Sequence, residues 1–114
     1  MVKRELKDCM PYSAPKHFNM AALRLQGRDE SGTQKFWVGM SHFLPGGGAE
    51  YDETPTEKVY FLLEGEVTVL NKDRAKIVLK QWDSIFIGHN EGREIINETN
   101  KPASMLVIIN YPNT

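Results

Sequence analysis

A chain of 114 residues, 40% hydrophobic and 25% charged, is long enough for one folded domain and too short for two. Its formal net charge of -1 excludes partners selected by bulk charge, so we expect neither nucleic acid nor a membrane as a partner. The charged N-terminus lacks a secretory apolar core, and no apolar run approaches the roughly 20 residues that cross a bilayer, so a cytoplasmic location is expected. The single cysteine excludes an intrachain disulfide.

The N-terminal third predicts an arm followed by two strands. Residues 1–20 are expected to lie over the body of the domain as an arm, because Pro11 and Pro15 discourage a helix. Residues 20–25 and 36–44 are apolar segments on either side of a polar turn, which predicts a hairpin or two adjacent strands. The Pro-Gly-Gly-Gly sequence at 45–48 predicts a flexible turn at the lip of a pocket.

The rest of the chain consists of short β-branched and aromatic runs separated by turn residues. The runs are residues 59–63, 66–70, 75–79, 85–87, 93–97 and 105–109. They recur at a spacing typical of small sandwiches and barrels, and no amphipathic segment of helical length interrupts them. The sequence therefore predicts an all-β domain.

Two of these stretches carry a family resemblance that covers about residues 36–112. The sequence EKVYFLLEGEVTV, residues 57–69, resembles the first motif of the cupin superfamily, a strand pair joined by a tight turn at Glu64 and Gly65. The sequence from Trp82 to Asn97 resembles the second motif more loosely. The resemblance implies a double-stranded β-helix, or jelly-roll barrel, over residues 21–114, with a pocket in its mouth. It also implies a homodimer, because the exposed edges of a small open barrel are commonly covered by a second subunit.

The metal ligands of the family are replaced in this chain. Metal-binding cupins hold a divalent ion with three histidines and one glutamate from the two motifs. The matching positions carry Asp52 and Thr54 in place of two histidines, Lys58 in place of the glutamate and Arg93 in place of the third histidine. An ammonium and a guanidinium group offer no lone pair at neutral pH and repel a cation. We therefore expect no metal cofactor.

The replacement of a metal site by two cations predicts an anion in the same place. Alternate side chains share one face of a strand, so Lys58 points with Tyr60, Arg93 points with Asn97, and the two cations meet inside the barrel. Two buried cations without a counter-charge would each cost several kcal/mol. The anion is a bound ligand, such as a carboxylate or enolate, or it is internal. An internal anion would make the pair a structural plug with one of three carboxylates, Asp52, Glu53 or Glu57.

These observations leave three functional hypotheses open. The first is a metal-independent isomerase, lyase or decarboxylase in which Arg93 clamps a carboxylate or oxyanion and Lys58 acts as electrophile or acid and base. Glu57 or His89 would shuttle protons. The second is a binding or sensor protein without catalysis. In both, the expected ligand-binding residues are Tyr60, Asp52, His89 and Asn97. The third is a cupin enzyme that holds a divalent transition metal with non-standard ligands, which would be His42, His89, Asp52 and Glu53.

Overall fold

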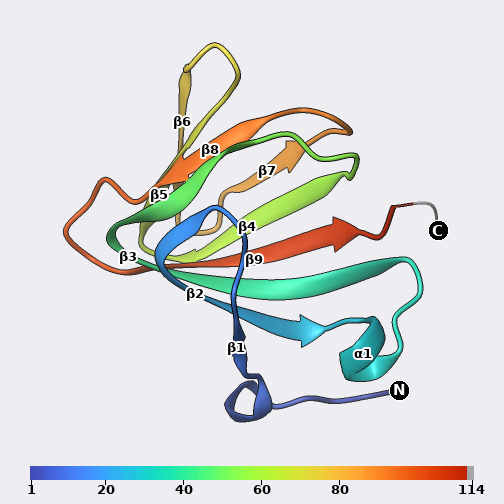
Figure 1. The fold of residues 1–114 in the computed structure, drawn as a ribbon. Helices are drawn as coiled ribbons and strands as arrows, with labels where there is room; N and C mark the ends of the chain where they lie inside the picture. Colours follow the sequence, from blue (N-terminus) through green and yellow to red (C-terminus); the bar gives the residue numbers. More distant parts are fainter. Residues whose placement is uncertain (113–114) are drawn as a thin grey trace.

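The structure, a computed structural model, describes residues 1–112 and places nine strands around a single hydrophobic core (Figure 1). Residues 113 and 114, the last two of the predicted barrel segment, lie outside the described residues. In chain order the elements are η1 (Leu6–Asp8), β1 (Pro11–Tyr12), β2 (His17–Gln26), α1 (Arg28–Ser31), β3 (Phe36–Asp52), β4 (Lys58–Glu64), β5 (Glu66–Leu70), β6 (Lys76–Lys80), β7 (Ser84–Ile87), β8 (Arg93–Ile96) and β9 (Ala103–Asn110).

The strands form two facing layers that share the long strand β3. Its first part pairs antiparallel with β2 and β9, and β9 continues through β4 to β7. Its last part pairs with β8, which continues through β5 to β6. Figure 1 shows these two layers one above the other, with the N-terminal arm crossing in front of the strands β2, β3 and β9. The predicted all-β, jelly-roll barrel is confirmed.

The glycine run at 45–48 is a bend inside β3, so the prediction of a flexible turn is wrong. Gly46 has a φ of 79°, which a glycine adopts without steric cost. A Cβ atom at Gly47 would overlap the carbonyl oxygen of Asn19, and one at Gly48 would overlap that of Ile95. The glycines therefore let neighbouring backbones pack closely where β3 passes from one layer to the other.

The predicted tight turn at Glu64 and Gly65 joins β4 to β5, but these two strands do not pair with each other. Strand β4 pairs with β7 and β9, whereas β5 pairs with β6 and β8, so the two strands belong to different layers. Gly65 has a φ of 82°, and a Cβ atom there would lie 2.6 Å from the carbonyl oxygen of Pro102. A glycine is therefore required both by the backbone conformation and by the close approach of the segment before β9.

The other predicted strands are confirmed within a few residues, including the adjacent antiparallel strands β2 and β3. The helical elements of residues 1–112 are two short turns, η1 and α1. No helix among these residues has the length and apolar character needed to cross a membrane. The arm returns to its own chain, because β1 pairs with β2 through Tyr12 and Ala22.

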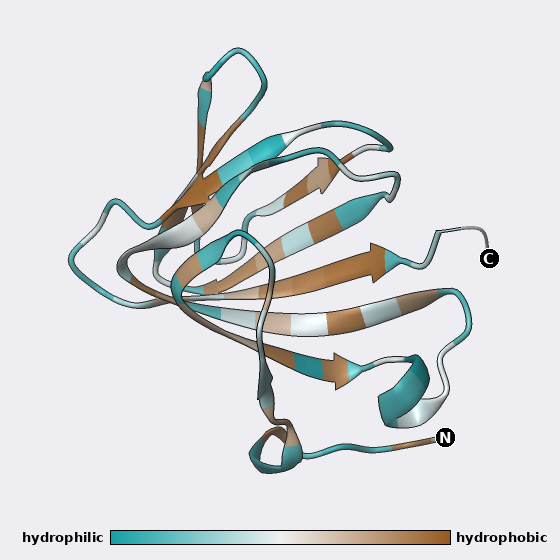
Figure 2. Cartoon of the chain, viewed as in Figure 1, coloured by the Kyte–Doolittle hydropathy of each residue, from teal (hydrophilic) through white to brown (hydrophobic). Residues whose placement is uncertain are grey.

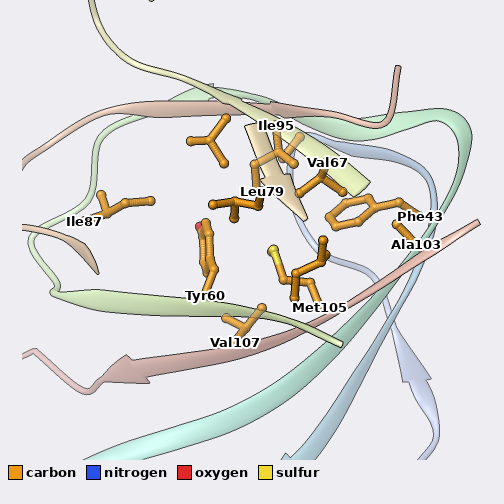
Figure 3. Close-up of a cluster of buried hydrophobic side chains, with 12 residues drawn as sticks. Phe43, Tyr60, Val67, Leu79, Ile87, Ile95, Ala103, Met105 and Val107 are labelled. Carbon is orange, nitrogen blue, oxygen red and sulfur yellow. The ribbon is translucent and has the colours of Figure 1, made fainter. Parts of the chain in front are cut away.

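The core fills one end of the barrel and leaves the other end open. In β4 the inward residues Lys58, Tyr60 and Leu62 are at most 4% exposed, as the strand alternation predicts. Leu62 lies opposite Met105 in the closed end, which the side chain of Phe43 also fills (Figure 3). At the other end of the strand Lys58 faces Ile109 across the sheet, and the core gives way to a cavity.

The outer face of the β3–β9–β4–β7 layer is apolar as well. Four residues lie in one row across these strands, Val38, Ile108, Val59 and Phe86, and Phe61 and Leu106 pair in the next row. Figure 2 shows the long apolar stretches of β4 and β9. Phe86 is 59% exposed, and nearby Trp82 is 64% exposed.

Candidate active site

The open end of the barrel contains a cavity of about 370 Å³ between the arm and the inner faces of both layers. Apolar walls come from the inner sides of β3 and β9, chiefly Trp37, Val107 and Ile109. The titratable lining residues are Tyr12, His17, Arg24, Asp52, Lys58, Tyr60 and Arg93. The four positions that hold the metal in metal-binding cupins, Asp52, Thr54, Lys58 and Arg93, all line this cavity. A cavity of this size, with apolar walls and several polar groups, suits a small organic molecule.

Lys58 projects from the first residue of β4 into the cavity wall. Lys58 is 4% exposed, and its Nζ donates a hydrogen bond to Thr54 Oγ1 at 2.8 Å. Thr54 is in turn 2.8 Å from Thr56 Oγ1. Burial, together with the positive charge of Arg93, lowers the pKa of Lys58 below its ordinary 10.5. The ammonium group therefore gives up its proton more readily than an exposed lysine does.

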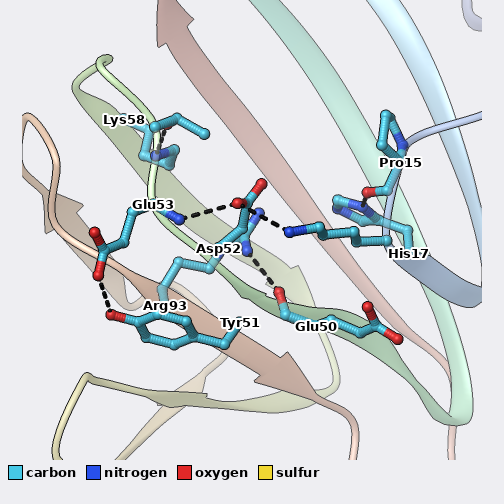
Figure 4. Close-up of polar contacts among 10 residues, drawn as sticks. Pro15, His17, Glu50, Tyr51, Asp52, Glu53, Lys58 and Arg93 are labelled. Atoms are coloured by element: carbon cyan, nitrogen blue, oxygen red, sulfur yellow. Dashed lines mark hydrogen bonds and ion pairs between the residues drawn. The ribbon is translucent and has the colours of Figure 1, made fainter.

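Arg93, at the start of β8, is 8% exposed and is fixed by two hydrogen bonds. Its Nε donates to the Tyr60 hydroxyl oxygen at 2.8 Å. Its Nη1 donates to the backbone carbonyl of Glu50 at 3.1 Å (Figure 4). No described residue bonds its Nη2, so that end of the planar fork is available to a ligand. Burial raises the pKa of Tyr60, while Arg93 opposes the rise, so the hydroxyl is neutral and can donate its proton in a further hydrogen bond.

No carboxylate of the described residues forms an ion pair with either cation. The five ion pairs among the described residues include neither Lys58 nor Arg93. Asp52 is the acidic residue of the cavity lining, and its Oδ1 lies 3.4 Å from Nζ of Lys16 at the mouth. The structural plug that the sequence left open is therefore not formed by these side chains. Three buried or half-buried cations, with Arg24 as the third, face one carboxylate that already has a partner.

His17, which is not among the predicted site residues, lines the same cavity. Its Nδ1 lies 2.7 Å from the carbonyl oxygen of Pro15, so Nδ1 carries the proton and Nε2 keeps its lone pair. Burial is the main cause of a lowered pKa of His17, and the charge of Arg93 adds to it. The imidazole is thus neutral at pH 7, and Nε2 can accept a proton.

Three predicted site residues lie outside the cavity. Glu57 is exposed, and its backbone N–H bonds the side chain of Asn110. His89 is exposed in the loop between β7 and β8. Asn97 shares the inward face with Arg93, but it lies 1% exposed at the closed end, where its amide donates to the carbonyls of Phe43 and Lys101. Neither proton shuttle suggested by the sequence therefore reaches the space that Lys58 lines.

The alternative metal ligands are not brought together either. His42 lies on the outer face of β3 with its Nδ1 2.8 Å from Ser104 Oγ, and Glu53 is exposed and accepts a hydrogen bond from Tyr51. Of the set, Asp52 alone lines the cavity. Among residues 1–112 no group of three or more His, Cys, Asp or Glu side chains is arranged to hold a metal ion.

Comparison with known proteins agrees with this architecture. The family model described as "Cupin domain" matches residues 39–109. The chain is 43% identical over 101 residues, 89% of its length, to a Mycobacterium tuberculosis protein named Beta-D-galactosidase Rv1717, of which the match covers 86%.

Similar solved structures include the polyketide cyclase RemF of Streptomyces resistomycificus and a sugar phosphate isomerase of Silicibacter pomeroyi. RemF has a TM-score of 0.85 and 18% identity, with 96% of this chain and 80% of that chain covered. The isomerase has a TM-score of 0.79 and 18% identity, with 96% of this chain and 76% of that chain covered. At such identities these two show a common fold. From the match of the family model and of the mycobacterial relative, the chain belongs to the cupin family.

Proposed function

We propose that the cavity binds a small organic anion, a carboxylate or enolate, and transfers protons on it without a metal ion, as an isomerase, lyase or decarboxylase does. The observation that supports this most is the absence of any ion pair for Lys58 and Arg93 within the described residues. Both side chains are nearly inaccessible, so an uncompensated charge there is costly until an anion binds.

The proposed roles follow from the free hydrogen-bond groups. Arg93 offers Nη2, and Tyr60 offers its hydroxyl proton, so together they would hold one carboxylate or a developing enolate oxygen. Lys58, whose pKa is lowered, would act as acid or electrophile near that group. His17 replaces the proton shuttles expected from the sequence, because it is a neutral base lining the same cavity.

Two measurements on one panel of organic acids test the proposal. Binding is read from saturable thermal stabilisation, and proton transfer is read by NMR as exchange of carbon-bound protons for deuterium in D₂O. We expect wild type to do both and Lys58→Met or Arg93→Met to do neither, while Lys101→Met, which changes an exposed lysine, behaves as wild type. Stabilisation without exchange or turnover would favour the sensor alternative, and the absence of any stabilisation would contradict the proposal.

A second candidate function, β-galactoside hydrolysis, is motivated by the 43% identical relative named as a β-D-galactosidase. Most glycosidases use two carboxyl groups, and the described cavity lining contains one, Asp52. Asp52 would then work with a group other than a second carboxylate, such as the Tyr60 hydroxyl that lines the same cavity. Release of nitrophenol from nitrophenyl β-D-galactoside by wild type, lost in both Asp52→Asn and Tyr60→Phe, would establish this function. No release at any pH would leave the organic-acid proposal alone.

A further inference from the structure

A third cation of the cavity, Arg24, forms no hydrogen bond or ion pair with the side chains of residues 1–112. Its guanidinium carbon lies 4.1 Å from the centre of the Trp37 ring and 4.7 Å from that of Tyr12. Its Nε is buried without a hydrogen-bond partner, and no ion pair among residues 1–112 involves it. Rings on its faces hold the plane of a guanidinium but leave the N–H groups at its edge unsatisfied. A buried donor in this state calls for an acceptor.

The surroundings of Arg24 are shaped to hold it there. Arg24 pairs with Gly39 across the β2–β3 ladder, and a Cβ atom at Gly39 would lie 2.9 Å from Cζ3 of Trp37. The missing side chain thus lets the indole ring lie over the strand and stack on the guanidinium. Tyr12 comes from the opposite side, because β1 of the arm pairs with β2 next to Arg24. The arm therefore builds part of the cavity.

Arg24 is well separated from the first two cations. The ladder places Arg24, Gly39, Val107 and Tyr60 in one row across β2, β3, β9 and β4. Three strand spacings of about 4.8 Å put some 14 Å of sheet between Arg24 and Tyr60, which bonds Arg93. Lys58 lies on β4 as well, two residues from Tyr60. The cavity thus has a pair of cations on one side and a single guanidinium on the other.

We infer that the ligand is a dianion, an organic molecule with two acidic groups separated by a chain of several atoms. One group binds Lys58 and Arg93, and the second binds the edge of Arg24. This inference rests on the proposed function and narrows its substrate class. A monocarboxylate binds one side of the cavity only, and a two-carbon diacid such as oxalate is too short to reach both sides. The volume of about 370 Å³ accommodates a molecule of the required length.

The test uses length-matched acids on metal-free protein. Calorimetric titration with hexanoate, oxalate and adipate should show adipate binding wild type at least about tenfold more tightly than the other two, since a charge-assisted hydrogen bond to a buried guanidinium is strong. In Arg24→Gln the advantage of adipate over hexanoate should vanish, and Arg24→Lys should recover part of it. Arg28→Gln is the matched control, because Arg28 is exposed and stacks on Tyr111 outside the cavity.

The outcomes separate the two proposals. Equal binding of hexanoate and adipate by wild type, unchanged in Arg24→Gln, would overturn the dianion and leave the anion site at Lys58 and Arg93 standing. Failure of all three acids to bind would overturn both. If Arg24→Gln does not fold, Arg24→Lys decides, since loss of the planar fork should reduce the preference for adipate while a charge is kept.

Discussion

Replacing Lys58 with methionine should stabilise the ligand-free protein at neutral pH. The substitution removes a buried charge without a carboxylate partner, a gain of about 3 kcal/mol, and methionine fills a similar volume. The lost hydrogen bond to Thr54 costs about 1 kcal/mol. The net gain of about 2 kcal/mol corresponds to a rise in Tm of roughly 8 °C for a domain of this size.

The pH dependence identifies the cause. Because the pKa of Lys58 is lower in the folded chain than its ordinary 10.5, the unfolded chain binds more protons between these two values. The free energy of unfolding of wild type therefore increases as pH rises through that window, because Lys58 loses its proton. The variant has no lysine at this position and does not show this increase. Differential scanning calorimetry from pH 7 to pH 10.5 should show the advantage of Lys58→Met shrinking. A variant less stable than wild type at pH 7, or an advantage independent of pH, would refute this account of an uncompensated buried charge.

Three further predictions concern the site, the closed end and the outer face. Tyr60→Phe should weaken carboxylate binding by about tenfold in calorimetric titration, because the Nε of Arg93 loses its acceptor and turns from the ligand; unchanged affinity would remove Tyr60 from the site. Asn97→Ala should lower the free energy of unfolding by about 2 to 4 kcal/mol in urea titration, since it leaves the carbonyls it bonds unpaired, yet it should not change ligand affinity relative to the remaining folded protein. We propose that a second copy of the chain covers the apolar outer face, so light scattering at micromolar concentration should give a homodimer that Leu106→Glu dissociates; a wild-type monomer would refute it.

The barrel and the pair of cations could be predicted because both follow from local patterns. Strand alternation places Lys58 with Tyr60 and Leu62 on one face, and this face is buried in the structure. The motif spacing identified the four positions Asp52, Thr54, Lys58 and Arg93, which line the cavity. It did so because the spacing reflects the register of the barrel strands and not the chemistry of the bound ligand. What the cavity binds could not be predicted in the same way, because the residues that hold metal elsewhere have been replaced.

The second half of the site could not be predicted, because it depends on contacts between distant segments. Arg24 lies on β2, and its ring partners come from the arm and from β3. A weak indication was present, since a charged residue within the apolar run at 20–25 is unusual for a buried strand. The arm predicted over residues 1–20 includes His17, yet β2 begins at this residue. The prediction of a flexible turn at 45–48 failed for a similar reason. A bend where a strand passes from one layer to the other is as rich in glycine as a flexible turn is.

The most direct measurement of the central claim is calorimetric titration of an organic acid into protein stripped of metal with a chelating resin. The resin replaces soluble chelators, which are themselves organic polyanions. We predict one binding site per chain for the metal-free protein, unchanged by added zinc, manganese, iron or nickel, and lost in Lys58→Met. Binding that requires a metal ion, or binding that survives in Lys58→Met with unchanged affinity, would contradict the claim that the two cations have taken the place of the metal.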